Sequence, residues 1–196
     1  DDIIIFIKDQ VSSSTNGEIN IANIEGNFVE GFWLSEVVYQ EEGLIIFSAG
    51  DIYIDPDVSR IITGKIVLSQ LVINNSYYNY DNQKSESQRS PVKSSLINWR
   101  FYISSLLIEK SLFIYKESAY DLQGDIKFEY NDGTQFNIFV LKVQSPNFTS
   151  PLVLSDGIIG ICKEELIISN LTAQSYFLSG EIDGMLNFYQ FSQSSG

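Results

Sequence analysis

The stretch that decides the fold is residues 65–73, Lys-Ile-Val-Leu-Ser-Gln-Leu-Val-Ile. Side chains of a β-strand alternate between its two faces, so an unbroken strand would place Gln70 in an otherwise apolar row. A slip of one residue at Ser69-Gln70 instead brings Ile66, Leu68, Leu71 and Ile73 onto one face. Such a slip is typical of a β-bulge, which bends and twists the strand that carries it.

The four-residue pattern at this slip, aliphatic-Ser-x-aliphatic, occurs four times in the chain. The copies are Leu34-Ser35-Glu36-Val37, Leu68-Ser69-Gln70-Leu71, Ile103-Ser104-Ser105-Leu106 and Ile168-Ser169-Asn170-Leu171, with steps of 34, 35 and 65 residues between them. The same slip groups Phe32, Leu34, Val37 and Tyr39 in the first copy, Phe101, Ile103, Leu106 and Ile108 in the third, and Leu166, Ile168, Leu171 and Ala173 in the last. A spacing of this kind in a strand-rich chain favours stacked β units.

Strand signals dominate the rest of the chain, and turn residues separate them. Asn131-Asp132-Gly133 lies between two alternating runs and predicts a hairpin. Helical periodicity is weak, and the best candidate for a helix is Pro56–Thr63 with Asp55 as its N-cap. The polar stretch Asp81–Ser95, in which Val92 is the one apolar residue, predicts a flexible linker. It separates a first β unit (1–80) from a second one (96–196) that continues it.

The pattern of slips predicts an all-β fold with at most one short helix. Bulges repeated at a fixed spacing would curl a long, antiparallel-rich sheet into an open groove with an apolar floor. The alternative is a closed β-sandwich, in which a second sheet covers the same apolar row. Some strands carry apolar residues on both faces, as Trp33, Val67 and Leu107 show, and this favours the groove.

Composition narrows the possible functions. The chain has 196 residues, a formal net charge of −13, no histidine and one cysteine, Cys162. The negative charge opposes binding to nucleic acid, and the lack of histidine removes the commonest general base and metal ligand. Asp51, Asp55 and Asp57 lack the glycine and glutamate of a calcium-binding EF-hand loop. We therefore expect a protein that is not an enzyme and that has no cofactor, metal site or catalytic residue.

Several stretches, taken in order, resemble the start of the periplasmic part of TamB-type proteins of the TamB and AsmA-like family. They are Ile19–Gly26, Gly31–Tyr39, Ile45–Ile54, Gly64–Ile73 and Leu96–Tyr130, with a looser likeness at Glu165–Gly184. The shared features are patterns of apolar residues and turns, and they cover most of the chain.

The resemblance implies a segment of a β-groove that crosses the periplasm of a diderm bacterium. It implies that the groove shields phospholipid acyl chains between the inner and outer membranes and supports outer-membrane protein assembly with a β-barrel partner. The full-length protein would be anchored in the inner membrane, and the anchor would lie outside this chain.

The expected ligands are phospholipid or detergent acyl chains. The expected lipid-contacting floor consists of the residues grouped by the slips: Phe32, Leu34, Val37, Tyr39, Ile66, Leu68, Leu71, Ile73, Phe101, Ile103, Leu106, Ile108, Leu166, Ile168 and Leu171. The alternative function is that of a β-sandwich module that binds carbohydrate or protein, with Tyr77-Tyr78-Asn79-Tyr80 as a stacking platform.

Overall fold

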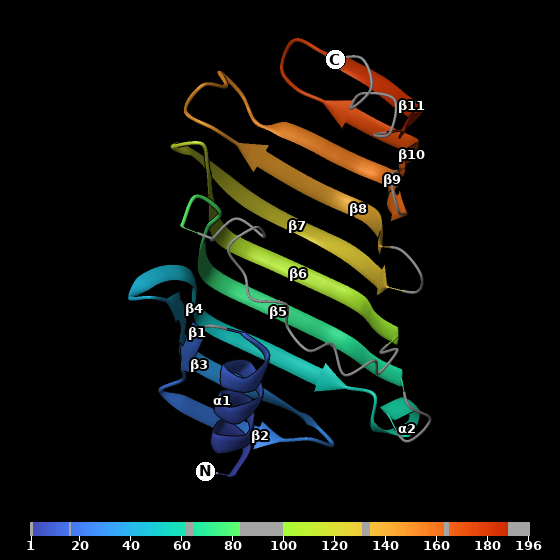
Figure 1. Ribbon diagram of the computed structural model, residues 1–196. Helices are drawn as coiled ribbons and strands as arrows, with labels where there is room; N and C mark the ends of the chain where they lie inside the picture. Colours follow the sequence, from blue (N-terminus) through green and yellow to red (C-terminus); the bar gives the residue numbers. More distant parts are fainter. Residues whose placement is uncertain are drawn as a thin grey trace, which may run out of the picture.

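A computed structural model describes residues 2–15, 17–61, 65–82, 100–130, 134–162 and 165–187 (Figure 1). The helices are α1 (Asp2–Ser14) and α2 (Val58–Ile61), and the strands are β1 (Gly17–Asn20), β2 (Asn23–Asn27), β3 (Gly31–Glu41), β4 (Leu44–Pro56), β5 (Lys65–Asn79), β6 (Arg100–Tyr115), β7 (Ser118–Tyr130), β8 (Thr134–Gln144), β9 (Leu152–Cys162), β10 (Glu165–Gln174) and β11 (Ser179–Asn187). All eleven strands belong to a single sheet.

The strands follow one another across the sheet in chain order, from β3 to β11, with β1 and β2 both paired to β3. Neighbouring strands are antiparallel, except that β5 and β6 run parallel with Leu68 opposite Ile103. One sheet therefore runs through both predicted units. Of the predicted linker Asp81–Ser95, only Asp81 and Asn82 lie within the described residues.

The sheet curls without closing into a barrel, as Figure 1 shows. The prediction of an open, curled all-β sheet is confirmed. The alternative of a closed β-sandwich is wrong for the described ranges, because they contain one sheet and no second sheet lies over its apolar face. The predicted hairpin is also confirmed, since β7 and β8 pair antiparallel with Tyr130 opposite Thr134; residues 131–133 lie outside the described part.

The slips in the second, third and fourth copies of the pattern are β-bulges. Ser69 has no partner in β4, because Gln70 pairs with Asp55 while Leu68 pairs with Pro56. In β6 and in β10, the two residues between the aliphatic pair face a single residue of the next strand, which is shown by register shifts between Ile103 and Leu106 and between Ile168 and Leu171. These bends were predicted from the sequence.

The first copy has no register shift at its slip and bends through a left-handed residue, which the fourth copy also has at Asn170, with a φ of 51°. Glu36 has a φ of 51°, in the left-handed region, and lies opposite Gly50 between the pairs Ser35–Asp51 and Val37–Ala49, which stay in register. Asn75 in β5 and Lys110 in β6 continue the same line with φ of 51° and 50°. The sheet thus has two lines of bends. One contains Glu36, Asn75 and Lys110, and the other contains the bulges at Ser69 and Ser104. Of the first line, the four-residue pattern indicated only the bend at Glu36.

The helices differ from the prediction in number and position. The expectation of at most one short helix is wrong, because the described residues form two helices. Of these, α1 was not predicted. In the predicted Pro56–Thr63 helix, α2 begins later, at Val58, and the cap is Asp57, whose Oδ1 accepts hydrogen bonds from Ser59 Oγ at 2.6 Å and Arg60 N at 3.3 Å. Pro56 is instead the last residue of β4, and Asp55 pairs with Gln70.

A cluster of buried apolar residues lies at the N-terminal end of the sheet, between the sheet and α1. Its members are Ile21, Phe32, Leu34, Val37, Ala49 and Ile52, and Ile7 of α1 packs against them. Val37 is only 2% exposed. The helix therefore covers one end of the apolar face (Figure 1).

Candidate functional site

The concave face of the sheet carries a continuous apolar surface, which we call the groove floor. Residues paired directly across neighbouring strands lie on the same face. One cross-strand row of the floor consists of Leu34, Ile52, Ile73, Ile108, Gly124, Leu141, Leu154 and Ala173, from β3 to β10. Every side chain in this row is aliphatic, and Gly124 adds no polar group.

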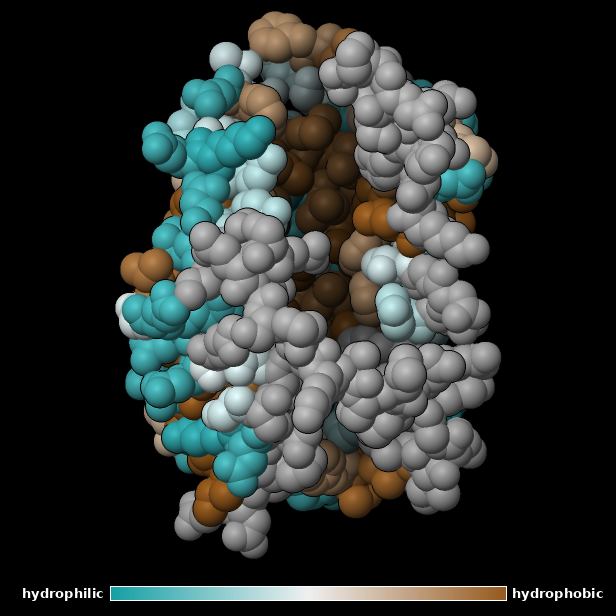
Figure 2. Space-filling view, viewed as in Figure 1, coloured by the Kyte–Doolittle hydropathy of each residue, from teal (hydrophilic) through white to brown (hydrophobic). Residues whose placement is uncertain are grey.

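A second row runs beside the first. It consists of Phe32, Ile54, Leu71, Leu106, Ile126, Ile138 and Gly157. A Cβ on Gly157 would lie 2.5 Å from the Cα of Leu171, so glycine lets Leu171 close the row at β10. Figure 2 shows the result as an apolar hollow on the face that carries α1 in Figure 1.

The length of the floor can be estimated from the strand spacing. Seven intervals separate β3 from β10, and at about 4.8 Å each the rows are about 34 Å long. Half of a bilayer's hydrocarbon core is about 15 Å thick. The floor is therefore longer than a phospholipid acyl chain that lies along it.

An aromatic row borders the floor toward one edge of the sheet. Tyr39, Phe47, Tyr78, Phe113 and Tyr120 face one another across β3 to β7. The rings of Tyr78 and Phe113 stack with centroids 5.6 Å apart, and those of Phe113 and Tyr120 are 6.3 Å apart. Aromatic rings with a polar tip suit a position between an apolar floor and water.

The floor contains two hydroxyl groups, and they are paired with each other. Ser76 Oγ donates to Ser111 Oγ at 2.5 Å, and Ser111 is 5% exposed. Both residues follow directly after the left-handed residues Asn75 and Lys110. Small side chains fit the inner side of a bend. Ser111 Oγ in turn donates to the carbonyl oxygen of Glu109 at 3.5 Å, so both hydroxyl donors have acceptors, which lowers the cost of burying them.

Coverage of the floor changes along its length. Under α1, Leu34 and Ala49 are buried. Outside α1 the floor is mixed: Ile73, Leu106, Ile108, Leu141 and Leu154 are half-buried, whereas Ile103, Ile126, Ile138 and Leu171 are buried. Within the described residues, only α1 lies over the floor as a secondary-structure element (Figure 1). No helix or second sheet of the described residues therefore lies over the β6–β9 part of the floor, and its half-buried side chains keep part of their surface accessible.

The structure brings the predicted floor residues together. Phe32, Leu34, Val37 and Tyr39 share one face of β3, and the sets of β5 and β6 pair one to one, from Ile66–Phe101 to Ile73–Ile108. Leu166 and Ile168 pair with Ile161 and Ile159 of β9 on the same face. The side chains of Ile66 and Phe101 lie outside the described part, and these two are placed by their backbone register alone.

Strands without the four-residue pattern supply the rest of the floor, and sequence reasoning missed them. Ile52 and Ile54 of β4, Ile126 of β7, and Ile138 and Leu141 of β8 are examples. Apolar alternation in their own strands was the available signal, but it does not tell which neighbouring strand each residue faces.

The opposite, convex face carries polar contacts between strands. Ser35 Oγ donates to Asp51 Oδ1 at 3.0 Å. Lys127 Nζ lies 5.0 Å from the centroid of the Tyr102 ring, and its hydrogen bond with the Tyr102 side chain raises the pKa of Lys127 above its ordinary value. Asp51 and Lys127 are thus charged groups of the convex face, whereas Glu41 of β3 accepts a hydrogen bond from Tyr39 of the aromatic row at 2.6 Å.

The Tyr77–Tyr80 segment does not form one stacking platform. Successive residues of β5 point to opposite faces, so Tyr78 joins the aromatic row on the concave face while Tyr77 lies on the convex face. Tyr77 Oη accepts a hydrogen bond from Asn79 Nδ2 at 2.9 Å, and Tyr80 packs edge-on against Tyr115. A single sugar ring could not stack on both Tyr77 and Tyr78.

The carboxylates considered for calcium are spread over different structural roles. Asp51 accepts the Ser35 hydrogen bond and Asp57 caps α2, where hydrogen bonding to Ser59 lowers the pKa of Asp57 below its ordinary value. In the part of the chain that the structure covers, no three acidic or cysteine side chains converge on a point that could hold a metal ion.

Neither described helix has the length and apolarity to cross a membrane. Comparison with known proteins finds no matching family model, no similar curated protein and no similar solved structure.

Proposed function

We propose that the groove floor binds hydrocarbon chains, and that the chain is a TamB-like segment of a periplasmic β-groove that shields phospholipid acyl chains on their way between two membranes. In this proposal the full-length protein supports outer-membrane assembly with a β-barrel partner. The observation that carries the proposal is the pair of apolar rows that run across β3 to β10, with no second sheet among the described residues over β6–β9.

The energetics of lipid transfer favour such a surface. Each buried methylene group contributes about 0.8 kcal/mol, so a chain of about 14 carbons loses on the order of 11 kcal/mol if it crosses water without a carrier. A floor of aliphatic side chains at about 4.8 Å intervals offers contact along the whole path. This function needs no acid, base or metal ion.

The aromatic row and the Ser76–Ser111 pair support the same proposal. The tyrosines of the row place rings at the border of the floor, where an apolar chain would meet water. Ser76 donates to Ser111, and Ser111 donates to the carbonyl oxygen of Glu109, so an acyl chain could lie over them without leaving a hydroxyl donor unpaired.

The test is phospholipid binding measured by native mass spectrometry after the purified protein has been stripped of lipid and mixed with phosphatidylethanolamine. The key variant is Leu106→Asn on the floor, and the matched control is Leu107→Asn, the next residue of β6. Both leucines are half-buried, but Leu107 lies on the convex face opposite Asp125.

We expect Leu106→Asn to weaken lipid binding about tenfold, which corresponds to the loss of roughly 1.4 kcal/mol of apolar contact. Leu107→Asn should bind lipid as the unaltered protein does. Circular dichroism checks that both variants remain folded. Equal binding by the two variants, or an unaltered protein that takes up no lipid, would contradict the proposal.

A further inference from the structure

Along one edge of the sheet, the connections between strands change from charged to uncharged from the N-terminal to the C-terminal end of the groove. The connections β3–β4, β6–β7, β8–β9 and β10–β11 all lie at this edge, together with the end of β5, because the strands that they join end or begin there. Toward the N-terminal end these segments carry Glu42, Asp81, Lys116 and Glu117. Toward the C-terminal end the connections 145–151 and 175–178 carry no charged residue.

The charge-free connections expose large apolar side chains. Tyr176, Phe177 and Leu178 are 81%, 78% and 70% exposed, and Phe148 on the adjacent connection is 43% exposed. We call these four residues the aromatic tip. Four neighbouring apolar side chains with such exposure to water are unusual on a protein surface, and they indicate a binding surface.

Both connections are held in place by hydrogen bonds. Tyr176 N donates to Ser150 Oγ at 3.1 Å and thereby links the two connections, while Ser175 N donates to Leu178 O at 2.7 Å. Gln144 Nε2 donates to the carbonyl oxygens of Ser145 and Phe148 at 2.9 and 3.0 Å. These bonds satisfy backbone groups that would be costly to bring into an apolar environment unpaired.

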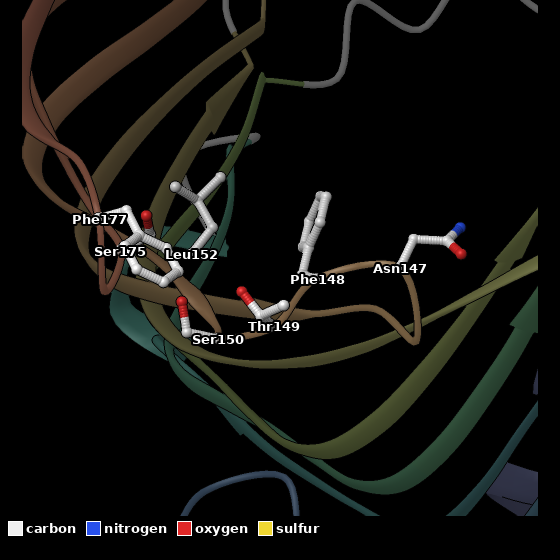
Figure 3. A pocket seen from close by; sticks show the side chains of 7 residues that line it. All are labelled: Asn147, Phe148, Thr149, Ser150, Leu152, Ser175 and Phe177. Carbon is white, nitrogen blue, oxygen red and sulfur yellow. The ribbon is translucent and has the colours of Figure 1, made fainter.

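The aromatic tip is continuous with the groove. A hollow of about 270 Å³ lies between the two connections and is lined by Phe148, Ser150, Leu152 and Phe177, among others. In Figure 3, Phe148 and Leu152 point toward the concave side of the sheet. Leu152 pairs with Val143 at the border of the groove floor, so the hollow connects the tip with the floor.

We propose that the aromatic tip docks into the interface of a bilayer of zwitterionic lipids. Exposed Tyr, Phe and Leu side chains with neighbouring Ser, Thr and Asn suit the boundary between headgroups and acyl chains. The lack of charge in both connections avoids the cost of bringing an ion into that boundary. The net charge of −13 disfavours an anionic surface, so the matching partner is a bilayer without net charge.

The proposal is tested by flotation of the purified chain with phosphatidylcholine vesicles. The key variant is Phe177→Ser, and the matched control is Phe139→Ser, since Phe139 is also exposed (52%) but belongs to β8. We expect Phe177→Ser to reduce vesicle binding about tenfold, and Phe139→Ser to leave it unchanged. Adding phosphatidylglycerol to the vesicles should weaken binding of the unaltered chain.

Three outcomes would overturn the docking proposal: no binding of the unaltered chain to phosphatidylcholine vesicles, equal binding by the two variants, or stronger binding to anionic vesicles. A tip that binds a protein partner instead of lipid would give the first of these. Docking does not depend on what the groove holds. The Leu106→Asn variant should still float with vesicles even though it binds free phospholipid poorly, so the two proposals fail separately.

Discussion

Val37 and Leu141 lie on the same face of the same sheet, but their surroundings differ. Val37 in β3 is 2% exposed and belongs to the core against which Ile7 of α1 packs. Leu141 in β8 is half-buried, and no helix or second sheet of the described residues lies over it. The comparison shows that the apolar face contains side chains packed under a helix and, in β8, side chains of both kinds: Ile138 is 3% exposed, whereas Leu141 keeps part of its surface accessible as a candidate binding surface.

The largest expected effect comes from placing a carboxylate in each region. Val37→Asp would bury a charge without a partner and should destabilise the fold by about 4 kcal/mol or more. Leu141→Asp should cost about 1 kcal/mol, because its carboxylate can reach water through the open groove. Urea unfolding followed by circular dichroism measures both values. If Leu141→Asp proved as damaging as Val37→Asp, the β8 region would have to be covered too.

Substitutions in α1, the helix that packs on the core around Val37, should have a smaller effect on the free energy of unfolding. Ile7→Ala removes a half-buried side chain from the covering surface and should cost about 1–2 kcal/mol. Ile5 lies on the outer side of α1, where it is 56% exposed, so Ile5→Ala should change the free energy of unfolding by less than about 0.5 kcal/mol. The same urea series distinguishes them, and equal losses would mean that α1 does not stabilise the fold through this face.

The part of the fold that the sequence predicts follows from periodicity. The grouping of Leu68 with Leu71, and of Ile103 with Leu106, needs only the alternation of strand side chains and the misplaced polar residue between them. The parallel pairing of β5 with β6 was not predicted, although the copies at Leu68 and Ile103 lie side by side because of it. Local alternation is the same in parallel and antiparallel strands, so it holds no information about the direction of a neighbour.

The parts that could not be predicted depend on contacts between distant residues. The helix α1 has a weak apolar pattern, and Ile7 is positioned by a surface that β3 and β4 build together. The aromatic row depends on the register that brings Tyr39, Tyr78 and Tyr120 into line across β3 to β7. Tyr176, Phe177 and Leu178 of the aromatic tip are adjacent in sequence, but the register of β8, β9 and β10 brings Phe148 beside them.

The smallest expected effect concerns the two lines of bends. Lys110 has a φ of 50°, a region that costs a residue with a Cβ about 1 kcal/mol, so Lys110→Gly should leave stability unchanged or raise it by up to about 0.5 kcal/mol. Ser104, at the other bend of β6, is not among the residues with positive φ. Ser104→Gly should therefore lower stability by about 0.5–1 kcal/mol. Thermal unfolding checks the pair, and a loss for both variants would show that the Lys110 side chain itself stabilises its bend.

The parallel pairing of β5 with β6 also has a consequence for the entropy of folding. Partners in this pairing lie 35 residues apart (103 − 68), whereas Tyr115 and Ser118 meet across a tight turn. Closing the longer loop costs about 2 kcal/mol more, on a logarithmic dependence on loop length. The two strands that meet there are the longest in the sheet, with 15 and 16 residues. Contacts between the apolar side chains of these two long strands, such as Leu68 with Ile103 and Leu71 with Leu106, oppose the entropy that the long closure removes.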